Sequence, residues 1–130
     1  MYLSRRPNNI PFKLVSNGSV ATIGAYDGIH LGHRKLLENM LELAHADGLP
    51  SVVMSFEPTP EEYFSSSSPP ARLMRFREKF DALASYGIDL FYCPRFDEQM
   101  QNIEVDTFIR QLLIRSLNIR HLVIGDDFRF

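Results

Sequence analysis

The sequence predicts an α/β fold in which a parallel β-sheet is covered on both faces by helices. Four short apolar segments alternate with three segments of helical periodicity, in the order β-α-β-α-β-α-β. Strands that alternate with helices in this way are joined by right-handed crossovers into a parallel sheet. Two of the strand candidates, SVVMSF and HLVI, are also nearly continuous apolar runs, which is typical of strands buried on both sides.

The strand candidates are short, rich in β-branched or aromatic residues, and bounded by glycine or polar residues. They span 19–24, 51–56, 88–92 and 121–124. The segment before the first strand contains Pro7, Asn8, Asn9 and Pro11, which break regular structure. We therefore expect an irregular lead-in over 1–18 and a single α/β domain over 19–130.

The helix candidates are recognised by apolar residues three and four positions apart. The first has its apolar face over 36–44 and ends at Asp47-Gly48, the second covers 73–84, and the third covers 105–117. Residues 57–70 lie between the second strand and the second helix. They are expected to form a loop, because prolines there flank a run of four serines.

The composition is that of an ordinary folded domain. Hydrophobic residues make up 45% of the chain and charged residues 23%, values that exclude disorder throughout. Fourteen Lys and Arg against sixteen Asp and Glu give a net charge of −2, without the basic surplus of a general nucleic-acid binder. No apolar run approaches the roughly 20 residues that span a bilayer. We therefore expect neither a nucleic-acid nor a membrane partner.

The cysteine content and the N-terminal sequence bear on location. The one cysteine, Cys93, excludes an intramolecular disulfide and fits a reducing compartment; we expect it to be a buried residue at a strand end. The first residues, MYLSRRPNNIPFKL, lack the apolar centre of a secretory leader. Together these features predict a cytoplasmic protein.

Glycine and polar residues gather where three of the predicted strands end. The segments are GAYDGIHLGH at 24–33, FEPTP at 56–60 and GDDFRF at 125–130. Ligands of open parallel sheets bind beyond the carboxyl ends of the strands, where the strand order reverses. If the first and last of the four predicted strands flank that reversal, the first and third segments face each other across a crevice.

The segment at 24–33 is the strongest candidate for a phosphate site. Its glycines allow close approach of the backbone to a ligand, and it leads into a helix N-terminus, whose N–H groups and dipole favour an anion. His30 and His33 are three residues apart, so in a helical turn they project to one side. Two imidazole donors there suit a phosphate chain that gains negative charge during a reaction.

Other common phosphate and metal motifs do not fit this segment. The sequence has no GxxxxGK[ST] loop and no GxGxxG fingerprint, and HLGH lacks the spacing of the H-E-x-x-H zinc motif. Arg72 and Lys79 lie on the second predicted helix. The sequence fits two interpretations of them equally well: exposure on a solvated helix face, or contact with a ligand.

Four motifs in this order resemble a known family. GxxDGxHxGH is similar to the HxGH signature of the Rossmann-like nucleotidylyltransferases. FEPTP, PPARL at 69–73 with Arg77-Glu78-Lys79, and GDDFRF are similar to the FMN adenylyltransferase module of prokaryotic bifunctional riboflavin kinase/FMN adenylyltransferases. The resemblance runs from about Val20 to Phe130. It implies a Rossmann-like three-layer α/β/α nucleotidylyltransferase fold with a parallel sheet, of which the C-terminal part is missing.

The resemblance also implies a reaction and a set of site residues. The reaction is transfer of AMP from ATP to FMN, giving FAD and pyrophosphate, with Mg²⁺ held mainly by the ATP phosphates. The catalytic residues implied are His30, His33 and Asp127, and Asp127 is also the implied metal ligand. The implied nucleotide-binding residues are Gly24, Ala25, Tyr26, Asp27, Gly32 and Gly125. The implied flavin-binding residues are Phe56, Pro58, Arg72 and Phe128.

Two positions depart from the family pattern, and two other functions stay open. Ala25 stands where the family usually has Asn, and Thr59 stands where it usually has His. The alternatives are another HxGH nucleotidylyltransferase, or a nucleotide- or flavin-binding module without catalysis.

The end of the chain falls inside GDDFRF, before a further Ser/Thr-containing phosphate motif and a riboflavin kinase domain that the resemblance implies. We therefore expect the 130-residue chain by itself to have little or no activity, and the riboflavin kinase domain to be absent from it.

Overall fold

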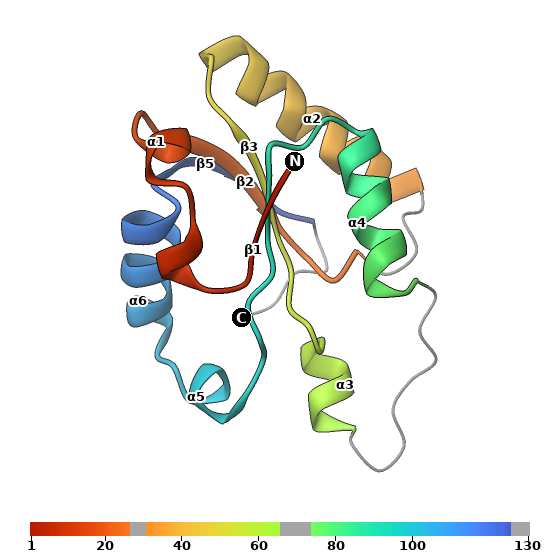
Figure 1. Cartoon of the computed structure of the whole chain (residues 1–130), viewed down its shortest axis with the longest axis vertical. Coiled ribbons are helices and arrows are strands. Elements are labelled where there is room, and N and C mark those ends of the chain that lie inside the picture. Colours follow the sequence, from red (N-terminus) through yellow and green to blue (C-terminus); the bar gives the residue numbers. More distant parts are fainter. Residues whose placement is uncertain (27–30, 66–73, 126–130) are drawn as a thin grey trace.

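A computed structural model of the chain describes residues 1–26, 31–65 and 74–125, with the side chains of residues 31 and 32 excluded. Within these residues, five strands form one sheet in the order β1-β4-β3-β2-β5, and every neighbouring pair is parallel (Figure 1). The strands are β1 (Tyr2–Ser4), β2 (Ser19–Ile23), β3 (Ser51–Met54), β4 (Leu90–Tyr92) and β5 (Ile119–Val123). The predicted parallel α/β sheet is confirmed.

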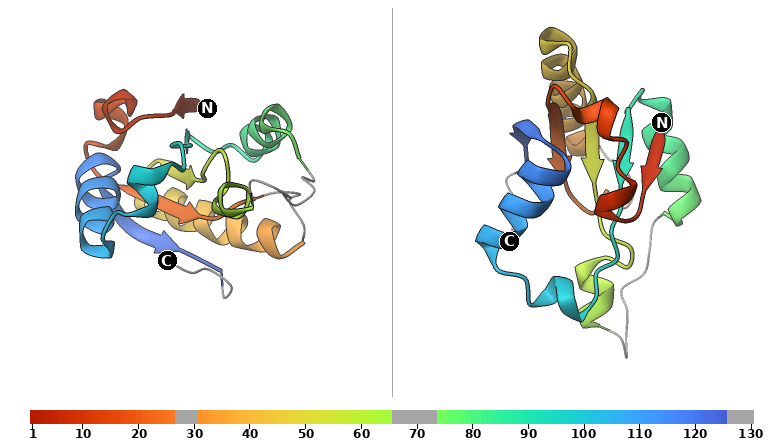
Figure 2. Two further views of the ribbon diagram at one scale, coloured as in Figure 1. Left: turned by 90° about the horizontal axis from the view of Figure 1, so that it is seen from below. Right: turned by 60° about the vertical axis from the view of Figure 1, so that its left-hand side comes forward.

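Helices cover both faces of the sheet (Figures 1 and 2). On one face lie α2 (Leu31–Asp47) and α4 (Phe76–Ser85). The opposite face is covered by η1 (Pro7–Asn9), α1 (Phe12–Val15), α6 (Val105–Thr107) and the π-helical stretch η2 (Phe108–Ser116). Two short helices, α3 (Pro60–Phe64) and α5 (Glu98–Gln101), follow the carboxyl ends of β3 and β4.

The strands divide the core into two layers, because successive side chains of a strand point to opposite faces. Val52 and Met54 join the cluster under η2, whereas Val53 joins the cluster under α2 and α4. All residues of β2, β3 and β4 are buried. The edge strand β5 differs: Leu122 is 37% exposed, so the burial on both sides predicted for 121–124 is not found there.

The lead-in predicted to be irregular contains regular structure. β1 pairs with β4 over three residues, from Tyr2 beside Leu90 to Ser4 beside Tyr92, and η1 and α1 follow. The prediction of an irregular segment over 1–18 was wrong at these elements. A strand of three residues is too short to show an alternating pattern, and it forms because the edge of β4 offers it hydrogen-bonding partners.

The segment 57–70, predicted to be a loop, contains the short helix α3. Thr59 caps it: its Oγ1 accepts a hydrogen bond from the Glu62 backbone N–H at 3.2 Å, and its own N–H donates to the Glu62 carboxylate at 2.9 Å. This is a reciprocal capping box, and Pro60 occupies a favourable first helical position. The Thr59 that departs from the family pattern therefore has a structural role here.

The strand order puts the predicted crevice between the carboxyl ends of β2 and β5. The chain runs from β2 to β3 to β4 in one direction, and β5 then returns to the other side of β2. The order therefore reverses between β2 and β5, as the sequence analysis supposed. Thr22 pairs with Val123, and the same register puts Gly24 level with Gly125. The segments after these two strands thus begin side by side, at the usual place of ligand binding in such sheets.

Candidate functional site

The segment after β2 turns sharply at Tyr26. Its backbone φ is 52°, a left-handed value that costs an L-residue about 1–2 kcal/mol. The turn folds the Tyr26 ring back over Gly24: a Cβ added to Gly24 would lie 2.8 Å from Cε2 of Tyr26. Gly24 is therefore required here by a neighbouring side chain.

The Tyr26 ring is a buried support for His33. Only 1% of Tyr26 is exposed, and its hydroxyl shares a 2.6 Å hydrogen bond with Oγ1 of Thr22 on β2. The ring centroids of Tyr26 and His33 are 5.0 Å apart at 45°. His33 lies in the first turn of α2 and is half-buried. The fold thus holds this imidazole at a helix N-terminus, where the helix dipole favours negative charge.

The Ala25 carbonyl is held from two other parts of the chain. The Lys79 ammonium, on α4, donates to it at 2.7 Å, and Oγ of Ser55, just after β3, donates at 3.1 Å. Lys79 is 1% exposed, so the solvated position considered for it from the sequence is wrong. The Ala25 side chain is exposed. Its departure from the family's Asn leaves both bonds in place, because they use the backbone.

An aromatic cluster follows the ends of β3 and β4. The Phe56 and Phe96 rings meet edge to face at 5.5 Å, and Phe96 also contacts Tyr63 at 5.2 Å and Phe64 at 5.8 Å. Phe64 is 62% exposed. The sequence analysis named only Phe56 of these four residues. The missed signal is that aromatic residues follow two neighbouring strand ends.

The loop that contains Pro58 is tied to the N-terminal segment by Arg5. Its guanidinium donates to the carbonyl of Cys93 at 2.5 Å and to that of Glu57 at 3.2 Å, and it lies 5.4 Å from the Phe76 ring centroid. The Glu57–Pro58 peptide bond is cis. The sequence analysis also missed Arg5, since the three groups it contacts come from three distant segments. Cys93 is fully buried directly after β4, as predicted.

The predicted site residues divide into those that the structure places and those that it does not describe. Gly24, Tyr26 and His33 lie together, Gly125 follows the neighbouring strand, and Phe56 belongs to the aromatic cluster. Gly32 is the second residue of α2. Ala25 follows Gly24, and Pro58 follows the cis Glu57–Pro58 bond. Five predicted residues lie outside the described part of the chain: Asp27, His30, Arg72, Asp127 and Phe128.

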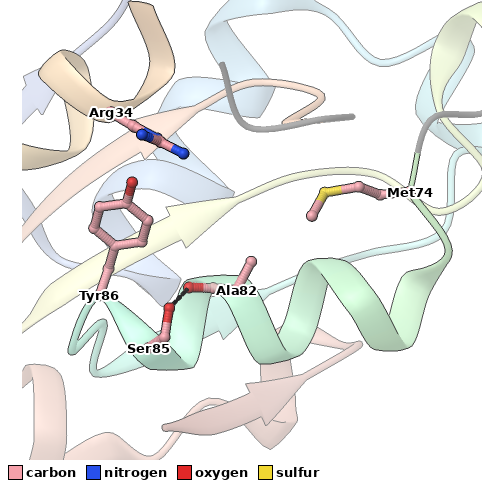
Figure 3. A pocket seen from close by; sticks show the side chains of 5 residues that line it. All are labelled: Arg34, Met74, Ala82, Ser85 and Tyr86. Carbon is pink, nitrogen blue, oxygen red and sulfur yellow. Dashed lines mark hydrogen bonds between the residues drawn. The ribbon is translucent and has the colours of Figure 1, made fainter. Parts of the chain in front are cut away.

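A pocket of about 390 Å³ lies between α2 and α4 and contains none of the predicted site residues. It is lined by Arg34, Met74, Ala82, Ser85 and Tyr86. Figure 3 shows the guanidinium of Arg34 and the hydroxyl of Tyr86 pointing toward each other across it. Its lining comes from α2, from α4 and from residues just before and after α4, whereas ligands of such folds bind beyond the strand ends.

The described residues include neither a metal-binding cluster nor a helix that could span a membrane. No group of three His, Cys, Asp or Glu side chains there could hold a metal ion. Among the same residues, no helix is long and apolar enough to cross a membrane.

Comparison with known protein families supports the family resemblance that the four motifs indicated. The family described as FAD synthetase matches residues 13–130. The chain belongs to the FAD synthetase family. This family match covers the Gly24–His33 segment, the aromatic cluster and Lys79, whereas Arg5 lies before it.

Three curated relatives are bifunctional riboflavin kinase/FMN adenylyltransferases. That of Escherichia coli (strain K12) is 46% identical over 87% of this chain, and that of Haemophilus influenzae is 40% identical over 89%. The relative from Buchnera aphidicola subsp. Acyrthosiphon pisum is 38% identical over the whole chain. This FAD synthetase-family chain spans 36–41% of the length of these relatives.

A solved structure shares the fold. It is titled a macrolide-efflux protein from Streptococcus pneumoniae and superposes with a TM-score of 0.76 at 24% identity, covering 98% of this chain and 41% of its own. At that identity the likeness supports the Rossmann-like α/β architecture of the FAD synthetase-family chain and nothing about its activity.

Proposed function

We propose that the chain is the FMN adenylyltransferase part of a protein that makes FAD. A phosphate oxygen of FMN attacks the α-phosphorus of ATP, the bond from that phosphorus to the bridging oxygen of the β-phosphate breaks, and pyrophosphate leaves. The observation that carries the proposal is the position of Gly24, Tyr26 and His33 beside the reversal of strand order, in a chain of the FAD synthetase family. Catalysis of this kind rests on positioning and charge stabilisation.

The nucleotide would occupy the crevice between the ends of β2 and β5. His33, whose ring lies against that of Tyr26 at the start of α2, would donate to the phosphates of ATP. We assign the same role to His30 and a phosphate- or metal-facing role to Asp127. Gly24, Ala25, Asp27, Gly32 and Gly125 would complete the nucleotide-binding backbone.

The flavin would bind beyond β3 and β4. The aromatic cluster of Phe56, Tyr63, Phe64 and Phe96 offers partly exposed rings against which a flat isoalloxazine can pack. Pro58 lies two residues after Phe56, and we place Arg72 and Phe128 on the same side.

Mg²⁺ would enter with ATP as part of the substrate. Magnesium sites commonly use one or two carboxylates together with substrate phosphates. Asp127 is the carboxylate we assign to it. The proposal also includes a cytoplasmic location and a riboflavin kinase domain elsewhere in the protein.

The test measures FAD formation from ATP and FMN by the protein at its natural length, with pyrophosphate counted as the second product. We expect equal amounts of FAD and pyrophosphate. Substituting His33→Ala should lower kcat by about 10²–10³, the usual effect of losing one such donor. The control is His45→Ala, since His45 lies on the exposed side of the same helix.

Competing substrates separate the alternatives. A preference for nicotinamide mononucleotide or phosphopantetheine over FMN would indicate another HxGH nucleotidylyltransferase. Binding of ATP or FMN without turnover would indicate a non-catalytic module and contradict the proposal. A decrease in kcat of less than about tenfold in His33→Ala would contradict the role assigned to His33.

A further inference from the structure

Lys79 is a buried charged residue for which packing gives no reason. It is the fourth residue of α4 and is 1% exposed, on a helix whose Leu83 and Phe80 pack against the apolar cluster over β3 and β4. Burying an ammonium group is costly unless acceptors compensate for the lost water. A hydrocarbon side chain would fill the same space without that cost, which points to a role for the charged group itself.

One acceptor that Lys79 binds belongs to the proposed nucleotide-binding segment, residues 24–33. Its Nζ donates to the Ala25 carbonyl at 2.7 Å across 54 residues of sequence. Ser55, which is fully buried, donates to the same oxygen at 3.1 Å. One carbonyl therefore receives donors from α4 and from the end of β3, which fixes the backbone of Ala25 between two elements of the core.

Tyr26, the residue after Ala25, connects the fixed Ala25 backbone to His33. Tyr26 holds a left-handed backbone conformation, and such conformations persist when the surroundings over-determine them. The Ala25 carbonyl is part of the peptide group that joins Ala25 to Tyr26, so its two donors set the plane from which the Tyr26 ring turns back. That ring lies 5.0 Å from the His33 ring.

We propose that Lys79 is a positioning residue for nucleotide binding: through the Ala25 carbonyl and Tyr26, its ammonium sets the place of the His33 imidazole. The inference rests on the proposed function for the identity of the ligand. It predicts that loss of the ammonium weakens ATP binding while FMN, bound beyond β3 and β4, keeps its affinity.

The experiment compares Lys79→Met with Arg77→Met in the protein at its natural length, using calorimetric titration with Mg-ATP and, separately, with FMN. Arg77 lies two residues away on the same helix, with an 82% exposed side chain paired with Asp81. Lys79→Met should raise the Kd for ATP about tenfold, as expected for one lost charge-assisted hydrogen bond. Its Kd for FMN and both constants of Arg77→Met should stay within about twofold of the unsubstituted protein.

A second measurement needs no nucleotide. The ring-proton resonances of His33 report the position of its imidazole over the Tyr26 ring. We expect them to move in Lys79→Met and in Ser55→Ala and to stay in place in Arg77→Met. Because Lys79 and Ser55 share one acceptor, the effects of the two substitutions on ATP affinity should not add.

The outcomes are distinguishable. Unmoved His33 resonances in Lys79→Met would overturn the proposal, even if ATP binding weakened through a direct contact with Lys79. Equal losses of ATP and FMN affinity would show a merely structural role and overturn it too. If Lys79→Met does not fold, the His33 resonances of Ser55→Ala test the proposal instead, and unmoved resonances in that variant would overturn it. Failure of the proposed function looks different, since the unsubstituted protein would then form no FAD from ATP and FMN.

Discussion

At the scale of single residues, Tyr92 carries a hydroxyl into the core at the end of β4. The residue is fully buried, and its Oη has no hydrogen-bond partner among the described residues. Burial raises the pKa of Tyr92 from 10.0 to about 12. Burying a hydroxyl without a partner costs free energy, so the Tyr92 hydroxyl lowers the stability of the fold. Its raised pKa also makes that stability depend on pH.

Tyr92→Phe should therefore leave the free energy of unfolding near neutral pH unchanged or raise it by about 1 kcal/mol. Between pH 10 and 12 the unfolded tyrosine loses its proton before the folded one. The folded state then binds more protons, and the contribution of Tyr92 to stability falls as pH rises, by about 1.4 kcal/mol per pH unit. Urea unfolding of both proteins at several alkaline pH values checks this. Equal pH dependence in the two would contradict it.

Some features of the segment at 24–33 could be predicted from the sequence, and others could not. The glycine and histidine spacing at 24–33 indicated a phosphate site directly, because it depends on local geometry. The use of Gly24 as space for the Tyr26 ring and the burial of Lys79 were not predictable. Both depend on which helix covers which strand, and a single lysine on a helix gives no signal of its burial.

At the scale of elements, α3 shows how a short helix depends on its cap. It has five residues, far fewer than the roughly 12–15 that make an isolated helix even marginally stable. The capping box at Thr59 and Glu62 stabilises this short helix. The helix also contributes two rings, those of Tyr63 and Phe64, to the aromatic cluster.

Thr59→Ala should loosen α3 and weaken FMN binding. Loss of a threonine cap costs about 1 kcal/mol, which corresponds to about fivefold in Kd if the aromatic rings must be reordered on binding. Flavin titration of the protein checks this, with Thr59→Ser as the control that keeps the hydroxyl. If Thr59→Ala and Thr59→Ser bound FMN equally well, the cap would have no part in the flavin side.

The long helices were predictable, whereas the short helices and the N-terminal strand β1 were not. The helical periodicity at 36–44, 73–84 and 105–117 lies within or close to helices of the structure, because several turns give several repeats of the apolar pattern. β1, α3 and α5 have three to five residues each, which is too few for a repeat. Partners elsewhere in the chain or a single cap decide whether such elements form.

At the scale of the whole molecule, Arg5 joins three distant parts of the fold. It binds carbonyls at the ends of β4 and β3 and lies over Phe76 at the start of α4. Through it, the N-terminal strand β1 is connected to the loop on the proposed flavin side. Its neighbour Arg6 is exposed, and within the described ranges the Arg6 side chain forms no hydrogen bond or ion pair.

Arg5→Ala should lower the free energy of unfolding by about 1–2 kcal/mol, since a charged donor bonded to backbone carbonyls contributes more than a neutral one. Arg6→Ala should leave it within about 0.5 kcal/mol of the unsubstituted chain, as is usual for surface positions. Urea denaturation of the two variants measures the difference. Equal losses would mean that removal of positive charge, and not the bonds of Arg5, lowers stability.

The sequence by itself determined the fold class, the parallel direction of the strands and the segments in which the proposed site lies. Those features follow from periodicity, breakers and local motifs, which act over a few neighbouring residues. Only the tertiary structure decided the strand order, the pairing of β1 with β4 and the three polar links from Lys79, Ser55 and Arg5 to strand-end carbonyls. Each link joins groups 30 to 88 residues apart, and such contacts form only when the packed core brings the segments together.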